Sequence, residues 1–354
     1  MATEARTEAA PIGKTWQRPG FVPLTGLGLV LALLLWLFYN LYLHPADFFQ
    51  VLLIGVTLGA LYGVVALGYT LVYGILELIN FAHGDVFMLG GMISATFMTE
   101  VFGLHNNPSI GYLIPVLLAT LAVAMVGCGL INVTVERIAY KPLRGAPRLA
   151  PLITAIGASF ILQNVGLVWK GSGYTSVPYI IRRSSNVFSV AGVTYPWFRF
   201  IVILLVVPLL LGLVYLVQAT RQGKAMRAVA QDKDAAAMMG INVNRTISFT
   251  FLIAGLLAGA AGLIYVTYET EIRFDQGFQL GLIAFTCAVF GGIGNLPGAV
   301  LGALVIGLIQ AFNEGLTWHS PGSTWTESIV FSILILILVF RPEGLLGERT
   351  PEGG

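Results

Sequence analysis

Three ionisable residues, Glu77, His83 and Asp85, stand close together in an otherwise apolar stretch of the sequence. Burying a charge among apolar groups is costly, so ionisable residues at such places are functional candidates by default. These side chains can line a path for a polar solute, relay protons, or orient a turn between two helices, and the residues alone leave all three roles open. A zinc site is not expected, because no second His or Cys lies at ligand spacing.

The composition says what surrounds this cluster. Of the 354 residues, 56% are apolar and only 10% are charged, whereas a soluble domain is about 25% charged. This excludes a disordered chain, a nucleic-acid-binding protein and a soluble enzyme. The two cysteines, Cys128 and Cys287, both lie in apolar stretches, so neither a disulfide framework nor a cysteine metal site is expected.

The apolar stretches divide into ten segments near the length of about 20 residues that crosses a bilayer. They are 24–43, 50–76, 80–99, 111–135, 149–169, 198–217, 247–268, 279–294, 297–316 and 326–340. The first is too long for the apolar region of a secretion signal, and no small-residue cleavage site follows it. The predicted fold is therefore an all-α polytopic membrane protein with about eight to ten transmembrane or re-entrant helices.

The placement of the basic residues predicts the orientation. If the N-terminus is cytoplasmic and every segment crosses, 14 of the 19 Lys and Arg residues fall on the cytoplasmic side. Such an excess is typical of cytoplasmic loops. We therefore expect a cytoplasmic N-terminal segment 1–23, a transmembrane domain 24–347 with an external loop 170–197 and a cytoplasmic loop 218–246, and a cytoplasmic tail 348–354.

Two of the apolar pairs, 50–99 and 279–316, are interrupted in a similar way. In each, an apolar run is followed by an Asn (Asn80 or Asn295), a helix breaker and a second glycine-spaced run. Such breaks in two halves of a chain point to a transporter binding site, and an inverted repeat is their usual origin. Free N–H groups at a half-helix N-terminus suit a substrate carboxylate. The alternative is two ordinary glycine-rich hairpins that pack tightly.

The cytoplasmic loop 218–246 holds a second candidate element. Its core, Lys224–Gly240, is rich in good helix formers and ends at a glycine, which predicts one short helix. Ala228, Ala235, Met238 and Met239 fall at helical spacing and form a small apolar face. Such a helix on the membrane surface needs a partner to pack against.

Four motifs together resemble those of one family, the permease subunits of branched-chain amino acid ABC importers of the LivH type. They are Ala66–Gly74 (ALGYTLVYG), Ile79–Asp85 (INFAHGD), Val289–Ala299 (VFGGIGNLPGA) and Arg341–Gly347 (RPEGLLG). They occur in the family's order over residues 50–347. Permeases for urea and for other neutral amino acids share much of this pattern, so the resemblance is firmer for the family than for the solute.

The resemblance implies one half of a pore heterodimer with a LivM-like permease, two cytoplasmic ATPase subunits and an extracytoplasmic substrate-binding protein, in a prokaryotic inner membrane. It also implies that Asp232–Gly240 is the coupling helix that enters an ATPase groove. The residues expected to serve that coupling are Arg227, Asp232, Ala235, Ala236 and Gly240.

The chain itself is not expected to be an enzyme or to hold a cofactor. Gly13-Lys14-Thr15 resembles the end of a phosphate-binding loop, but Glu8 stands where the pattern needs a glycine. ATP and Mg²⁺ are therefore expected on the partner ATPases. A proton-coupled secondary transporter that uses His83 and Asp85 is the alternative. The residues expected to line the pathway or its gate are Asn80, Phe81, His83, Gly84, Asp85, Gly294, Asn295, Pro297 and Gly298.

Overall fold

The computed structural model describes residues 21–76, 78, 80–106, 108–147, 149–180, 185–341 and 343–347. Glu77, nearly all of the predicted N-terminal segment 1–23 and the predicted tail 348–354 lie outside the described residues. The chain divides after Pro45 into two units. The first contains one apolar helix, α1 (Phe21–Leu43), and the second contains all the other elements.

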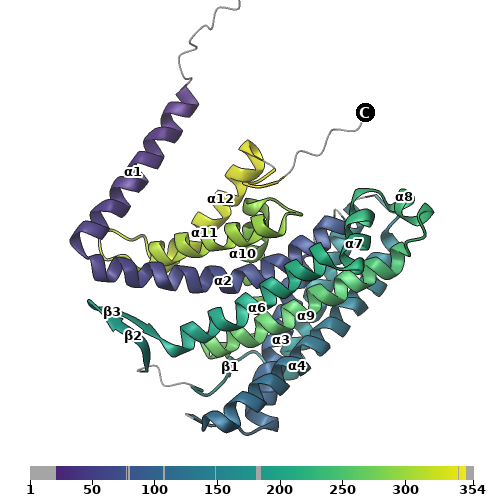
Figure 1. The fold of residues 1–354 in the computed structure, drawn as a ribbon, viewed down its shortest axis with the longest axis horizontal. Helices are drawn as coiled ribbons and strands as arrows, with labels where there is room; N and C mark the ends of the chain where they lie inside the picture. The colour runs from purple at the N-terminus through teal and green to yellow at the C-terminus, as the bar shows by residue number, and fades with distance from the viewer. Residues whose placement is uncertain are drawn as a thin grey trace, which may run out of the picture. The chain divides into compact units, whose positions relative to one another are not determined.

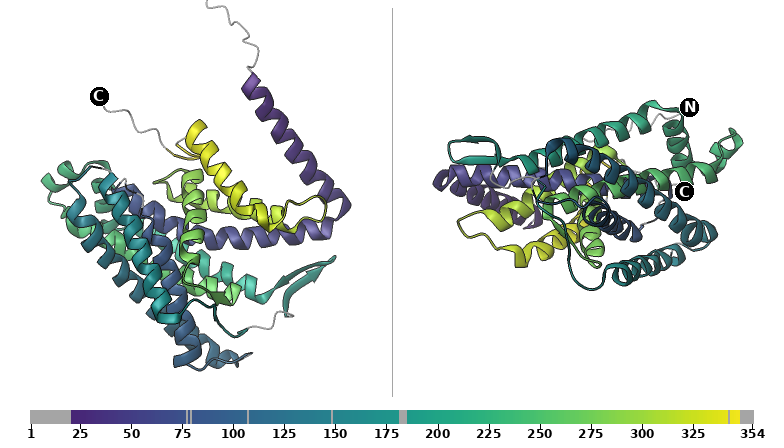
Figure 2. Two further views of the ribbon diagram at one scale, coloured as in Figure 1. Left: turned by 180° about the vertical axis from the view of Figure 1, so that it is seen from behind. Right: turned by 90° about the horizontal axis from the view of Figure 1, so that it is seen from below.

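The second unit is a helical bundle with two small antiparallel β elements (Figures 1 and 2). Its helices are α2 (Pro45–Leu76), α3 (Ala82–Thr96), α4 (Ile110–Val135), α5 (Leu149–Lys170), α6 (Trp197–Ala219), α7 (Arg221–Gln231), α8 (Lys233–Met238), α9 (Val243–Glu269), α10 (Gln276–Gly291), α11 (Leu296–Gly315) and α12 (Thr326–Phe340). π-Helical turns follow α3 (Phe97–Val101) and α4 (Glu136–Tyr140), and single 3₁₀ turns span Lys141–Leu143 and Ser323–Trp325.

The β elements join loops on one side of the bundle. β1 (Thr175–Ser176) pairs with β4 (Glu271–Ile272), with Thr175 opposite Ile272. β2 (Asn186–Val190) and β3 (Val193–Pro196) form a hairpin within the predicted external loop. This hairpin lies toward one end of the bundle, and α7 and α8 lie at the other, which we call the α7 end (Figure 1).

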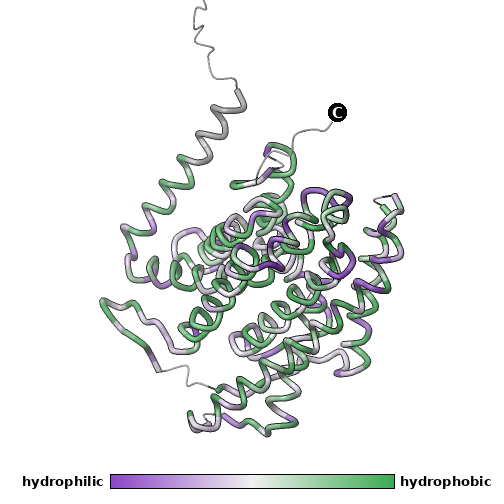
Figure 3. The backbone as a smooth tube through the Cα atoms, turned by 45° about the vertical axis from the view of Figure 1, so that its right-hand side comes forward, coloured by the Kyte–Doolittle hydropathy of each residue, from purple (hydrophilic) through white to green (hydrophobic). Residues whose placement is uncertain are grey.

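Each of the ten predicted segments corresponds to a helix. Within the described residues, seven helical stretches are long and apolar enough to cross a membrane, and Leu31–Leu43 and α10 are shorter apolar helices. Most of the helical backbone carries the hydrophobic colour in Figure 3. The predicted polytopic all-α fold is therefore confirmed.

The predicted single helix over 224–240 is wrong. Asp232 has an extended backbone, with φ −155° and ψ 116°, and separates α7 from α8. Its carboxylate accepts hydrogen bonds from the N–H groups of Asp234 (2.8 Å) and Ala235 (2.9 Å). An aspartate at this position satisfies N–H groups that a new helix leaves unpaired, so it starts α8 rather than continuing α7.

Close contacts between glycines hold the bundle together. A Cβ atom at Gly259 of α9 would lie against the Ala124 backbone of α4, and one at Gly90 of α3 would lie 2.9 Å from the Gly259 Cα. Small residues let helix backbones approach in this way, which is how membrane helices gain packing contacts. The buried helix α3 lies at the centre of these contacts, against α4, α5, α9 and α10.

The two interrupted hairpins run in the same sense. Gly55 and Gly59 of α2 lie against Leu308 and Leu304 of α11, so α2 and α11 are antiparallel. Since α10 is also antiparallel to α11, with Gly302 against Cys287 and Gly291, α2 and α10 point the same way. This agrees with the predicted topology, in which every segment crosses and both breaks lie on the cytoplasmic side. The inverted repeat expected from the two breaks does not relate these two hairpins.

Candidate functional site

The predicted pathway residues fall into two groups, one at each break. Asn80, Phe81, His83, Gly84 and Asp85 follow α2 and begin α3, whereas Gly294, Asn295, Pro297 and Gly298 join α10 to α11. Both breaks lie at the α7 end. Three residues of the second group, Gly294, Asn295 and Pro297, line a sizeable cavity.

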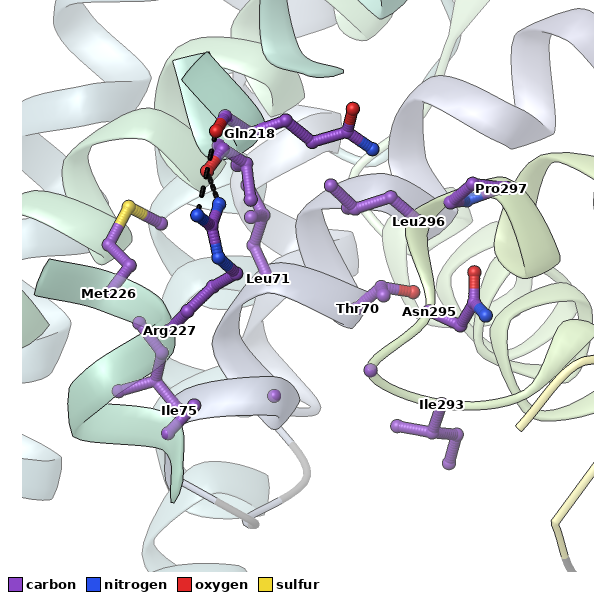
Figure 4. Close-up of a pocket in the computed structure, with 14 residues that line it drawn as sticks. Thr70, Leu71, Ile75, Gln218, Met226, Arg227, Ile293, Asn295, Leu296 and Pro297 are labelled. Carbon is purple, nitrogen blue, oxygen red and sulfur yellow. Dashed lines mark hydrogen bonds between the residues drawn. The ribbon is translucent and has the colours of Figure 1, made fainter. Parts of the chain in front are cut away.

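That cavity has a volume of about 520 Å³ and lies between α2, α7 and the second break. Figure 4 shows Met226 and Arg227 on one side, Asn295, Leu296 and Pro297 on the other, and Thr70 and Leu71 between them. The remaining lining residues are Gly74, Ile75, Val217, Gln218, Ala230, Ile293 and Gly294. The lining is mainly apolar with a few polar groups, which is usual for a small-molecule site.

Arg227 joins α7 to the end of α6. Its guanidinium donates hydrogen bonds to the backbone carbonyls of Val217 and, at 3.5 Å, Gln218 (Figure 4). The last carbonyls of a helix have no partner within that helix, so a basic side chain placed there stabilises its end. The neighbouring side chain of Met226 is buried and anchors α7 from the same turn.

The second break is a tight loop whose glycines are required by its backbone. Gly292 and Gly294 have φ values of 109° and 91°, in a region that side chains with a Cβ rarely adopt. Asn295 then begins α11, because its side-chain oxygen accepts a hydrogen bond from the N–H of Gly298 at 3.0 Å. The side-chain nitrogen of Asn295 donates to the carbonyl of Leu346 at 2.8 Å.

Asn80, at the first break, is buried instead. Its side-chain oxygen accepts a hydrogen bond from the Tyr140 hydroxyl at 3.0 Å. It shares a cavity of about 10 Å³ with Tyr69, Phe285 and Ile293. A space of this size holds at most about one water molecule. The structure therefore brings the two breaks together, but not around a space large enough for a solute.

His83 lies between α2 and α3. Its imidazole fills the space left by the missing side chain of Gly68 and meets the Tyr69 ring edge-on, with 4.9 Å between ring centroids. Within the described residues, neither ring nitrogen has a hydrogen-bond partner. The side chain is fully buried and does not line the 520 Å³ cavity.

Asp85 points from α3 toward α5. One carboxylate oxygen accepts a hydrogen bond from the Ser159 hydroxyl at 2.5 Å, and Gln163 donates to Ser159 at 3.2 Å. The other oxygen has no partner among the described residues. His83 and Asp85 therefore face different helices, and they do not form a paired site.

The two remaining residues of the first group, Phe81 and Gly84, pack against α10. The Phe81 ring lies 6.1 Å from that of Phe285, and a Cβ atom at Gly84 would meet the Gly277 carbonyl. These contacts place α3 close to α10. Within the described residues, no group of three His, Cys, Asp or Glu side chains is placed to hold a metal ion.

The predicted coupling residues lie together on the short segment α7–α8. Ala236 is buried, Ala235 is half-buried, and Gly240 ends α8 with a φ of 84°. Met238 and Met239, expected on the packed face, are each 83% exposed. Because α8 begins anew at Asp232, its faces do not continue those of α7.

Several buried or half-buried polar residues around the first break and the cavity were not predicted from the sequence. Glu136 is fully buried, is paired with Arg144 and accepts a hydrogen bond from Ser248 at 2.8 Å. Ser159 and Gln163, one helical turn apart on an apolar span, carry a spacing that could have indicated a polar partner inside the bundle. Tyr140 and Thr70 carry no such pattern.

Comparison with known proteins places the chain among bacterial permeases. Residues 51–339 match the protein-family model described as "Branched-chain amino acid transport system / permease component". The chain is 37% identical to the high-affinity branched-chain amino acid transport system permease protein BraD of Pseudomonas aeruginosa over 310 residues, covering 86% of the chain and 97% of the relative. It is 36% identical to the corresponding permease protein LivH of Escherichia coli over 311 residues, with the same coverage.

Among solved structures, PsaBC from Streptococcus pneumoniae in complex with Fab matches with 15% identity and a TM-score of 0.41. The match covers 88% of this chain and 97% of that one.

Proposed function

The chain belongs to the permease-component family of branched-chain amino acid transport systems, and from this membership we propose that it carries branched-chain or other neutral amino acids inward by alternating access. In transport systems of this family ATP is hydrolysed by separate subunits, and the permease component holds no cofactor. The observation that carries the proposal is the family match, which runs from α2 to α12 and so includes both breaks and the cavity.

The cavity has the chemistry that such a solute needs. Leu71, Ile75 and Met226 offer an apolar surface to an aliphatic side chain, whereas Thr70 and Gln218 offer polar groups. A zwitterion that leaves water must find hydrogen bonds inside, because an unpaired buried polar group is costly. The cavity meets both needs without a buried full charge, because Arg227 is exposed and its guanidinium is already bound to carbonyls.

The α7 end is the cytoplasmic end in this proposal. Of the 12 Lys and Arg residues in the described part of the chain, nine lie on loops, on short helices or at the start of α9 at that end, and only Lys170, Arg199 and Arg273 lie toward the other. Excess basic charge is typical of cytoplasmic loops. The predicted cytoplasmic C-terminus follows from the same orientation, and the cytoplasmic N-terminus stays a prediction from the count of spans.

The proposed partners are a second, LivM-like permease, two ATPase subunits and an extracytoplasmic substrate-binding protein. The short helix α8 supports an ATPase contact, because Met238 at its end and Met239 directly after it are exposed beside a buried Ala236. Exposed methionines form adaptable apolar contacts. Arg227 and Asp232 then serve the coupling by fixing α7 to α6 and by starting α8.

Reconstitution of the chain with its partner subunits in vesicles tests the proposal. We expect uptake of labelled leucine that requires ATP and the binding protein, and that unlabelled isoleucine and valine suppress. Competition by urea rather than by isoleucine would favour a small-polar-solute permease. Uptake by this chain alone under a proton gradient would favour the secondary transporter that uses His83 and Asp85.

A charge-reversal pair tests the coupling residues. Asp232→Lys removes the cap of α8, and we expect ATP hydrolysis to continue while uptake falls at least about tenfold. Asp234→Lys makes the same charge change on an exposed side chain that caps nothing, and its effect is expected to be smaller. Normal uptake by an assembled Asp232→Lys complex would contradict the assignment.

A further inference from the structure

The C-terminal segment Arg341–Gly347 folds back onto the second break. It forms a tight turn in which the Gly344 N–H donates to the Arg341 carbonyl at 2.8 Å. Leu345 and Leu346 have side chains that are 40% and 43% exposed, so few apolar contacts hold this turn. Its backbone makes the contacts instead.

Those contacts complete the end of α10. The Gly292 N–H serves the carbonyls of Ala288 and Val289, which leaves those of Phe290 and Gly291 without a partner in their own helix. The N–H groups of Leu345 and Leu346 donate to these two carbonyls at 2.9 and 3.0 Å. A helix that ends without such donors, away from water, leaves costly unpaired carbonyls.

Glycines permit this approach. Gly344 has a φ of 74°, and a Cβ atom there would lie 2.5 Å from both the Gly292 nitrogen and the Val289 oxygen. A Cβ atom at Gly292 would in turn meet the Gly347 nitrogen. The two segments therefore touch backbone to backbone, with no space for side chains between them.

Asn295 ties the turn to α11 as well. Its side chain accepts from Gly298 at the start of α11 and donates to the Leu346 carbonyl in the turn. The loop Gly292–Asn295 is thus held from both sides, and part of it lines the 520 Å³ cavity opposite Arg227.

We propose that Arg341–Gly347 is an intramolecular clasp that holds the loop between α10 and α11 as a fixed wall of the cavity, and that ATP-driven uptake depends on this wall. Asn295 is then a positioning residue at the junction of three segments. The role of the clasp in transport rests on the proposed function, whereas the contact itself does not.

Hydrogen exchange of the assembled complex tests the contact first. The amides of Leu345 and Leu346 are expected to exchange at least about tenfold more slowly than in a free peptide, although their side chains are exposed. Exchange at the free-peptide rate in the unmodified protein would overturn the inference, and this measurement requires no variant to fold.

A matched pair of glycine variants tests the consequence. Gly344→Ala adds a Cβ atom that collides with Gly292, whereas Gly322→Ala has a similar φ of 87° but nothing within 4 Å of its Cβ. We expect Gly344→Ala to lose the amide protection and to reduce ATP-driven uptake at least about fivefold, and Gly322→Ala to do neither. Full protection and full uptake in Gly344→Ala would overturn the clasp. Absence of leucine uptake by the unmodified complex, with the two amides still protected, would instead contradict the proposed function alone.

Discussion

The two breaks in the bundle are closed by different chemistry. Side chains from the end of α4 and the loop that follows cover the break after α2, whereas the backbone of the C-terminal clasp covers the break after α10. Asn80 at the first break is buried and bonds to a tyrosine, and Asn295 at the second caps a helix and bonds to a carbonyl.

The cover of the first break depends on buried polar side chains. Beside Asn80 and Tyr140, it includes Glu136, which is fully buried and joined to both Arg144 and Ser248. Arg144 also donates to Asn244, so the loop after α4 is bound to the start of α9. Removal of any of these side chains leaves a buried group with fewer partners.

The cover of the second break depends on the absence of side chains. Its donors are backbone N–H groups, and its close contacts are between glycines. The comparison teaches that one sequence pattern, an Asn followed by a breaker and small residues, can be stabilised in two ways. The first way is sensitive to the loss of a side chain and the second to the gain of one.

The largest expected effect of a side-chain loss is at Glu136. Glu136→Ala leaves the Arg144 guanidinium without its buried carboxylate, and breaking a buried pair costs about 3–5 kcal/mol of unfolding free energy. Unfolding in mixed micelles measures it. The control is Glu100→Ala, which removes the 62% exposed partner of Lys170 and is expected to cost about 1 kcal/mol or less. Equal costs for the two variants would contradict the account of the first break.

A large effect of a side-chain gain is expected at Gly302, where α10 and α11 pack against each other. Its Cβ would meet the Cys287 carbonyl and lie 2.7 Å from the Gly291 nitrogen, so Gly302→Ala is expected to destabilise the protein by about 1–3 kcal/mol. Gly212→Ala in α6 has nothing within 4 Å of its Cβ. It is expected to stabilise the helix by about 0.5–1 kcal/mol, because alanine favours helices over glycine. Thermal unfolding of both variants gives the comparison, and a stabilised Gly302→Ala would refute it.

A smaller effect is expected for the bond between Asn80 and Tyr140. A double-mutant cycle with Asn80→Ala and Tyr140→Phe isolates their interaction, and a coupling energy of about 0.5–1.5 kcal/mol is expected for one hydrogen bond. The corresponding cycle with Asn295→Ala and Leu346→Ala is expected to give no coupling, since Asn295 bonds to the Leu346 backbone. Coupling in the second cycle but not in the first would contradict the account in which side chains cover the first break and backbone groups cover the second.

The smallest effect is expected for the side chains of the clasp. Leu345→Ala and Leu346→Ala keep the N–H groups that serve α10, so each is expected to change the unfolding free energy by less than about 0.5 kcal/mol and to leave uptake unchanged. A large loss of stability in either variant would show that the leucine side chains, and not the backbone, hold the turn.

Local pattern predicted the spans well and the surroundings of the site poorly. The ten apolar segments required no knowledge of neighbours, because the bilayer demands long apolar helices whatever they pack against. The boundary between α7 and α8 at Asp232 was missed, because the residues on both sides favour a helix and only the capping by Asp232 separates the two helices. The pathway residues Asn80, His83 and Asp85 were grouped by their closeness in sequence, yet they bond to or pack against three different parts of the bundle. Their part in the pathway stays a prediction.

The sequence by itself determined that this is a polytopic membrane protein with two interrupted hairpins and a basic α7–α8 segment. These features follow from hydrophobicity, charge and short motifs, which act locally. Only the tertiary structure decided that Asn295 meets Leu346 across 51 residues, and that the cavity lies between α7 and the second break. Such contacts depend on how closely helix backbones approach, and that distance is set by glycines on two helices at once.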